Sequence, residues 1–221
     1  MPVEPADTWV FGYGSLMWNP GFSFEEARPA RLTGYHRAFC VYSIHYRGTT
    51  RRPGLVLGLD RGGVCDGIAF RIEPNARERT LTYLRRRELI YGVYREALVP
   101  LDIANLANGE PGRTVWAVTY IAERAHPAYA GALPLARQAR MIRGAAGRGG
   151  TNLDYALNTR RHLADFGIRE PALDRLATVL GPIAGRCPNG AKSLARSWAW
   201  KPHSSPPMVR DNRFGYRAKL V

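Results

Sequence analysis

The chain passes from strand to loop within Trp9-Val10-Phe11-Gly12-Tyr13-Gly14-Ser15-Leu16. The apolar run at 9–13 predicts a β-strand, and the glycines, with Asn19-Pro20-Gly21 after them, predict a tight turn. Successive backbone N–H groups in such a turn can point toward one anion. The stretch therefore predicts an early strand and a loop suited to a carboxylate or an oxyanion, although an ordinary glycine turn explains it as well.

Apolar runs and turn residues alternate through the first third of the chain, and helical patterns follow. We expect strands at 32–42, 55–59 and 64–72, with a turn at 60–63, then a helix at 75–89 and two strands at 95–103 and 114–121 joined at 108–112. Further helices are expected from Pro134 to Ile142, from an Asn152 cap to Phe166, and from Pro171 to Leu180. This order predicts an α+β fold, with helices packed on a mixed, largely antiparallel sheet or open barrel.

Composition bounds the domain organisation and the partners. The 221 residues carry a formal net charge of +14, which suits nucleic acid, an anionic membrane surface or a small acidic substrate. The arginines are scattered, and no finger spacing, RNA-binding aromatic hexamer or basic zipper is present, so nucleic-acid binding is the less favoured alternative. We predict a domain at 1–185 and a basic tail at 186–221, rich in Pro, Ser and Trp.

Cysteine and histidine usage argues against disulfide and metal frameworks. The three cysteines lie far apart, which favours reduced thiols, and the histidines form no HExxH pair or Cys/His cluster. The chain starts without a basic segment followed by an apolar run, and nowhere do eighteen apolar residues stand together. We expect a soluble cytoplasmic protein without a metal.

The early glycine turn is not a known phosphate or nucleophile motif. Met17 stands where a dinucleotide fingerprint needs a third glycine, and the Gly-Lys-Ser/Thr of a phosphate loop is missing. Ser15 lacks the G-x-S-x-G context of a nucleophilic serine. The turn is therefore a candidate for binding rather than for covalent catalysis.

A second candidate is Glu88 at the end of the predicted helix. Leu81, Leu84 and Glu88 follow one helical stripe, so the carboxylate should face the core, where burial raises the pKa of a carboxyl group. The alternative is a surface ion pair with a neighbouring arginine.

These features together resemble the ChaC-type gamma-glutamylcyclotransferases, some of which act on glutathione. The likeness spans roughly residues 9–175 and is carried by segments at 10–22, 34–39, 45–49, 53–56, 83–88 and, more weakly, 145–156. Where many relatives read Ser-Thr-Asp-His-Arg-Gly, this chain reads Ser43-Ile44-His45-Tyr46-Arg47-Gly48.

The resemblance implies a fold, a reaction and site residues. It implies a cofactor-independent lyase that converts glutathione to 5-oxoproline and cysteinylglycine. By this likeness Glu88 is the catalytic acid and base, and the substrate-binding residues are Val10, Phe11, Gly12, Tyr13, Gly14, Ser15, Leu16 and Tyr155. Arg47 is a further candidate that attracts the anionic substrate, or else an exposed loop arginine. The alternatives are activity on other γ-glutamyl amino acids or amines, a basic nucleic-acid-binding module, and a regulatory protein that has lost activity.

Overall fold

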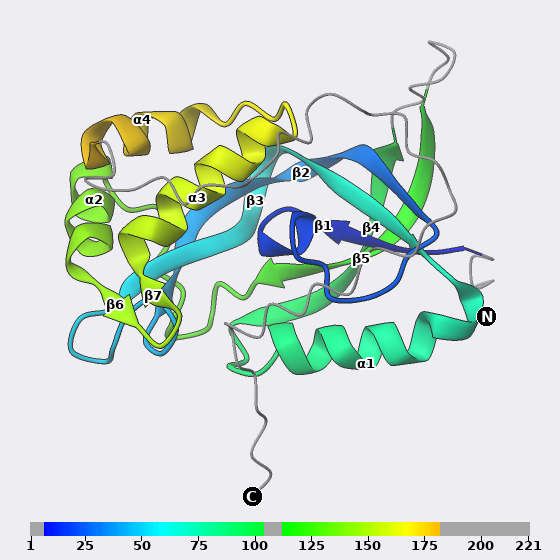
Figure 1. Ribbon diagram of the computed structural model, residues 1–221, viewed down its shortest axis with the longest axis horizontal. Coiled ribbons are helices and arrows are strands. Elements are labelled where there is room, and N and C mark those ends of the chain that lie inside the picture. The colour runs from blue at the N-terminus through cyan, green and yellow to red at the C-terminus, as the bar shows by residue number, and fades with distance from the viewer. Residues whose placement is uncertain (1–6, 104–111, 182–221) are drawn as a thin grey trace, which may run out of the picture.

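The computed structural model describes residues 7–103 and 112–181 and contains a closed five-stranded barrel (Figure 1). Neighbouring strands follow the order β1-β3-β2-β4-β5, and all pairs are antiparallel except β1 with β5, whose parallel pairing closes the barrel. The barrel strands are β1 (Thr8–Gly12), β2 (Glu26–Ser43), β3 (Gly54–Ile72), β4 (Tyr94–Ile103) and β5 (Arg113–Ala122). The predicted α+β class with a largely antiparallel sheet is confirmed, and the barrel is closed.

The expected turn at 60–63 is wrong, because β3 runs without interruption through these residues. Gly62 and Gly63 have positive φ angles and lie opposite Gly34 at a shift in the β2–β3 register. This irregularity is a β-bulge, which bends a strand pair while both strands continue. Glycines that suit a turn also suit such a bulge, so the local sequence did not distinguish the two.

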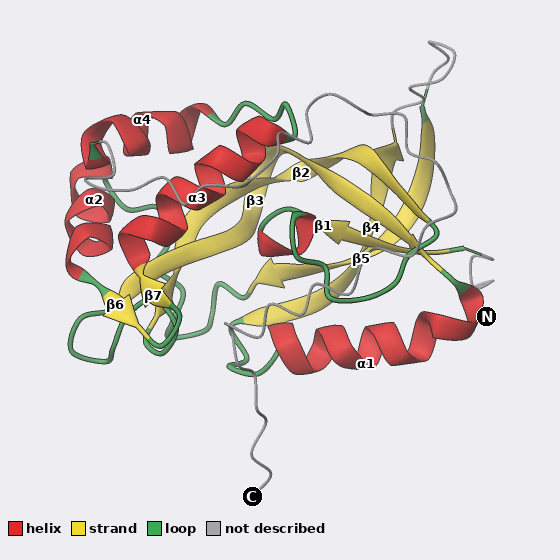
Figure 2. Cartoon of the chain, in the orientation of Figure 1, coloured by secondary structure: helices red, strands yellow, loops and turns green. Residues whose placement is uncertain are grey.

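The helices form two groups (Figure 2). A short helical turn, η2 (Pro74–Ala76), leads into α1 (Arg77–Glu88), which lies along one side of the barrel. The other three helices pack against one another beside the long β2–β3 hairpin; they are α2 (Leu135–Gly144), α3 (Asn152–Asp165) and α4 (Pro171–Leu180). A two-stranded ribbon, β6 (Ala146–Gly147) with β7 (Gly150–Thr151), connects α2 to α3.

The predicted helices are found, with one correction at a cap. The side chain of Thr151, and not of Asn152, accepts the hydrogen bond from the Asp154 N–H that caps α3. Asn152 is buried and serves another contact described below. Residues 108–111 of the connection predicted at 108–112 and the tail at 186–221 lie outside the described residues, so the proposed domain boundary stays a prediction.

Several arginines in the described part of the chain form ion pairs. Arg71 pairs with Glu25 and Glu26, and Arg85 pairs with Glu96 across to β4. Arg124 pairs with Asp60. None of the described helices has both the length and the apolar character that a membrane span requires.

Asp60 anchors the segment that follows β5. Its carboxylate accepts hydrogen bonds from the Tyr129 hydroxyl at 2.7 Å and from Arg124 Nε at 2.7 Å. Burial by itself would raise the pKa of Asp60, but the hydrogen bonds from Tyr129 and Arg124 outweigh it and hold the pKa below its ordinary value. The Asp60 carboxylate therefore binds a proton less readily in the folded state than in the unfolded chain.

We expect Asp60→Asn to lower the free energy of unfolding at neutral pH by about 1.5–3 kcal/mol, because it weakens buried charge-assisted hydrogen bonds. The stabilisation from Asp60 is complete above the unfolded-state pKa and is lost as pH falls through the folded-state pKa. Urea unfolding from pH 7 into the acid range should therefore show a flatter pH dependence for the variant. Asp165→Asn, at a side chain that is 63% exposed, is the control; equal slopes for wild type and Asp60→Asn would contradict the expectation.

Candidate functional site

Glu88 is the last residue of α1 and lies at the edge of the core. Leu81 and Leu84, which share its helical stripe, are 4% and 0% exposed, and the Glu88 side chain is 20% exposed. Burial raises the pKa of Glu88, while the charge and hydrogen bond of Arg87 act in the opposite direction without cancelling it. Both sequence interpretations hold in part, because the carboxylate faces inward and also pairs with an arginine.

Arg87 connects Glu88 to the loop after β1. Its Nε lies 3.0 Å from Glu88 Oε1, and its two terminal nitrogens donate to Ser15 Oγ at 3.0 Å and to the Asn19 carbonyl oxygen at 2.9 Å. The same guanidinium also reaches the Pro20 carbonyl oxygen at 3.3 Å. One planar cation therefore fixes the position of the acid relative to the glycine turn.

The loop after β1 presents backbone N–H groups. A short 3₁₀ turn, η1 (Ser15–Met17), begins here, and the Met17 and Asn19 N–H groups bond to the carbonyl oxygens of Gly14 and Ser15 at 2.9 Å. Within 7–103 and 112–181, the N–H groups of Gly14, Ser15 and Leu16 have no hydrogen-bond acceptor. Consecutive unsatisfied N–H groups at a turn make a concave site suited to an anion.

Four tyrosines lie within the electrostatic influence of Glu88, namely Tyr13, Tyr94, Tyr120 and Tyr155. Burial is the main cause that raises the pKa of Tyr13, Tyr94 and Tyr155, and the Glu88 charge raises each of them further. The Tyr94 hydroxyl donates to the Leu57 carbonyl oxygen at 2.6 Å, and the Leu57 N–H donates to the Tyr155 hydroxyl at 3.4 Å. These phenols are therefore neutral near pH 7 and add no charge to the surroundings of the carboxylate.

Tyr155 is held in place from two sides. Phe39 meets its ring edge-on with 6.1 Å between ring centroids, and Arg47 Cζ lies 5.2 Å from its centroid. Arg47 also donates to the carbonyl oxygens of Gly149 and Thr151 at the β6–β7 ribbon. Arg47 is thus half-buried and bound to other parts of the protein, unlike the exposed loop arginine that was the alternative.

Asn152 attaches the start of α3 to the barrel. Its side-chain oxygen accepts from the Leu55 N–H at 2.7 Å, and its side-chain nitrogen donates to the Leu55 carbonyl oxygen at 2.7 Å. The amide thereby acts as a neighbouring strand would toward β3. This pair of bonds sets the depth at which Tyr155, one helical turn further on, meets the barrel.

Asn152→Ala should lower the free energy of unfolding by about 2–5 kcal/mol, because it leaves a buried N–H and a buried carbonyl group without partners. Asn158→Ala, at a half-buried position on the same helix, is the matched control and should cost much less. Chemical denaturation of both variants measures the difference. Similar losses for the two variants would show that the paired bonds to Leu55 contribute little.

The predicted binding residues fall into two groups, those buried in the core and those close to Arg87 and Glu88. Val10 and Phe11 are fully buried in β1, and Leu16 is 5% exposed; all three belong to the core. Ser15 contacts Arg87 through its hydroxyl, and Tyr13 and Tyr155 lie within the electrostatic influence of Glu88. Sequence reasoning did not assign Arg87 or Tyr94 to the site, although Arg87 lies directly before the predicted acid, and it expected Asn152 only as a helix cap.

No described group of three or more His, Cys, Asp or Glu side chains is arranged to hold a metal ion. Two surface hollows of about 290 and 300 Å³ are both lined by Ile168, Arg169 and Glu170, and neither is lined by Glu88. The candidate site is therefore defined by the convergence of the acid, the loop and the tyrosines.

The fold and the site together define an α+β barrel protein with an inward-facing carboxylate beside a loop whose N–H groups at 14–16 have no acceptor in the part of the chain that the structure describes. The family model described as ChaC-like protein matches residues 8–181. The chain belongs to this ChaC-like family.

Similar proteins support this assignment. The glutathione-specific gamma-glutamylcyclotransferase of Escherichia coli K12 is 38% identical over 85% of this chain and 79% of its own. The human glutathione-specific gamma-glutamylcyclotransferase 1 is 32% identical over 74% of this chain and 71% of its own. The crystal structure of a yeast gamma-glutamyl cyclotransferase specific to glutathione covers 80% of this chain and 96% of its own with a TM-score of 0.71, at 22% identity, and thus shares the fold.

Proposed function

We propose that this chain is a gamma-glutamylcyclotransferase that converts glutathione to 5-oxoproline and cysteinylglycine. The observation that carries the proposal is Glu88, a largely buried carboxyl group with a raised pKa, held by Arg87 beside the N–H groups at 14–16, which have no acceptor among the described residues. The relatives named above, at 38% and 32% identity, bear names that specify this activity.

In the proposed reaction the substrate supplies both reacting groups. The α-amine of the γ-glutamyl residue attacks its own γ-carbonyl carbon, a new C–N bond closes a five-membered lactam, and the amide bond to cysteine breaks. Because attacker and target are in one molecule, the enzyme must fold the chain into a reactive shape and transfer protons. This chemistry requires no cofactor.

Glu88 is proposed to carry the proton. A free α-amine has a pKa of about 7.7–8.0 and is largely protonated near neutrality, so a base must remove a proton before it attacks. The carboxylate takes this proton before the attack and a second one from the same nitrogen after the C–N bond has formed. The resulting acid passes each proton to the leaving nitrogen, which departs as an ammonium group. Burial brings the pKa of Glu88 closer to that of the amine, which makes removal of the amine proton less uphill.

The glycine turn is proposed to bind the negative end of the substrate. The N–H groups of Gly14, Ser15 and Leu16 can donate either to the α-carboxylate or to the carbonyl oxygen as it gains charge. Tyr13 and Tyr155 are proposed to line the same site. Arg47 is proposed to act partly through Tyr155, over whose ring it lies, in addition to attracting an anionic substrate.

The test is release of 5-oxoproline from reduced glutathione by purified protein, with cysteinylglycine measured in parallel. Equal molar release of both products supports the reaction. Dipeptides of γ-glutamate with other amino acids, and γ-glutamylamines, form the comparison set. Release from these compounds but not from glutathione would reject the glutathione assignment and favour the broader cyclotransferase.

A further inference from the structure

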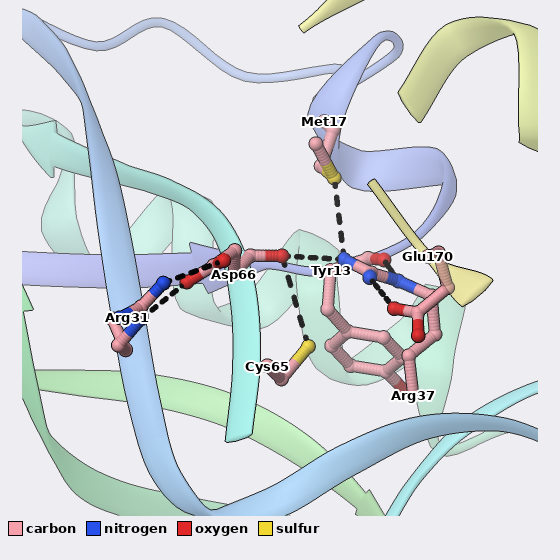
Figure 3. Close-up of polar contacts among 7 residues, drawn as sticks. All are labelled: Tyr13, Met17, Arg31, Arg37, Cys65, Asp66 and Glu170. Atoms are coloured by element: carbon pink, nitrogen blue, oxygen red, sulfur yellow. Dashed lines mark hydrogen bonds and ion pairs between the residues drawn. The ribbon is translucent and has the colours of Figure 1, made fainter. Parts of the chain in front are cut away.

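Arg37 on β2 is a fully buried cation behind the glycine turn (Figure 3). Its Nε donates to the Tyr13 carbonyl oxygen at 2.5 Å, and Nη2 donates to the Asp66 carbonyl oxygen at 2.6 Å. Its Nη1 lies 2.6 Å from the Glu170 carboxylate, which forms the ion pair. One guanidinium therefore joins the loop after β1, strand β3 and the residue before α4.

Stability alone is a weak reason for this arrangement. Desolvating a charge is costly, and a buried ion pair often contributes no more than an apolar side chain of similar volume. What the guanidinium provides, and an apolar side chain does not, is a planar set of donors that fixes several acceptors in defined directions. The acceptor that matters for the site is the Tyr13 carbonyl group.

The Tyr13 carbonyl and the Gly14 N–H belong to one peptide unit. The unit is planar and trans, so its C=O and N–H bonds point in opposite directions. Because Arg37 holds the carbonyl oxygen, the Gly14 N–H must point away from the Arg37 guanidinium. The Gly14 N–H is one of the three unpaired donors of the glycine turn described above.

We propose that Arg37 is a positioning residue that orients the Gly14 N–H toward the substrate by holding the Tyr13 carbonyl oxygen. The inference rests on the function proposed above and deepens it. Arg37 touches no substrate atom in this arrangement and acts through the peptide unit. A donor that is already oriented needs no reorganisation when charge develops on the substrate, which is the main source of electrostatic catalysis.

Glu170 completes the arrangement from the helical layer. It directly precedes α4, and its side chain is 21% exposed, whereas that of Arg37 is 0% exposed. A buried arginine needs a partner charge, and the loop after β1 and strand β3 offer Arg37 the uncharged carbonyl oxygens of Tyr13 and Asp66. The ion pair thus links the placement of α4 to the orientation of the glycine turn.

The first test compares Arg37→Met and Arg37→Lys with Arg71→Met, a matched loss of an ion-paired arginine on β3 that contacts Glu25 and Glu26. We expect kcat/KM for glutathione to fall about 10²-fold in Arg37→Met, the size of effect seen when one such donor is lost. In Arg37→Lys, kcat/KM should fall about tenfold, because an ammonium group cannot reproduce the planar arrangement of donors on a guanidinium. Arg71→Met should stay within about threefold of wild type, with thermal unfolding of all variants recorded.

A binding measurement separates positioning from a general loss of stability. In the Glu88→Gln background, calorimetric titration with glutathione should show weaker binding when Arg37→Lys is added and unchanged binding when Arg71→Met is added. If Arg37→Met does not fold, the kinetic and binding measurements on Arg37→Lys alone test the proposal. Arg37→Lys with wild-type kcat/KM and wild-type affinity would overturn the proposal.

A third measurement does not depend on the substrate. The amide ¹H–¹⁵N resonance of Gly14 should shift in Arg37→Lys and stay in place in Arg71→Met, because only the first releases the Tyr13–Gly14 peptide unit. Failure of wild type to release 5-oxoproline would reject the proposed function while this resonance still tests the positioning. An unmoved Gly14 resonance in Arg37→Lys would reject the positioning itself.

Discussion

Glu88→Gln should reduce 5-oxoproline release from glutathione by at least about 10²- to 10⁴-fold, the usual contribution of a general acid and base. Glutamine keeps the size of the side chain and can still accept a hydrogen bond from Arg87, which lies 3.0 Å from Glu88 Oε1. It cannot take a proton from the α-amine or return one to the leaving nitrogen. The loss should therefore fall on kcat more than on KM.

The matched control for this variant is Glu78→Gln on the same helix. Glu78 is in the first turn of α1 and its side chain is 77% exposed, so the change should leave the rate and the fold intact. Initial rates with both variants and wild type decide the matter. Glu88→Gln with a rate within threefold of wild type would remove Glu88 from the catalytic role.

Replacing Arg87 should produce the second large effect. Arg87 lowers the pKa of Glu88 against the effect of burial, so Arg87→Met should raise that pKa further and leave less carboxylate at neutral pH. The acid limb of kcat/KM should then move to higher pH. Arg87→Met also removes the contacts to Ser15 and Asn19, so the glycine turn should lose its position relative to Glu88. From the two effects together we expect kcat/KM at pH 7 to fall by about 10- to 10²-fold.

Arg86→Met is the control, because Arg86 is the exposed neighbour on the same helix. The pH profile of kcat/KM should be the same for Arg86→Met and wild type. An acid limb that does not move in Arg87→Met, or that moves to lower pH, would show that Arg87 does not set the protonation of Glu88.

Sequence patterns anticipated the parts of the site that depend on neighbours in the chain. The inward stripe of Leu81, Leu84 and Glu88 follows from the helical repeat alone. The strand and glycine turn at 9–16 follow from local composition, and the predicted helix Pro171–Leu180 has the observed bounds. In each case the determining residues lie within a few positions of one another.

Tertiary structure decided the features that join distant residues. The continuation of β3 through Gly62 and Gly63 depends on pairing with β2. This pairing produces a β-bulge at a position where the local sequence predicted a turn. Asn152 was expected to cap a helix, but the fold directed its side chain to Leu55, 97 residues away. The position of a partner so far along the chain is not encoded in local periodicity.

The sequence by itself determined that this protein is an α+β chain with a glutamate facing inward from a helix and a glycine turn after its first strand. Only the tertiary structure decided that the parallel pairing of β1 with β5 closes the barrel, that Arg87 joins the acid to the turn, and that Arg37 pairs with Glu170. The physical reason is that helix periodicity and turn propensity act over a few residues. Strand register and the partner of a buried charge are selected by the packing of the whole chain.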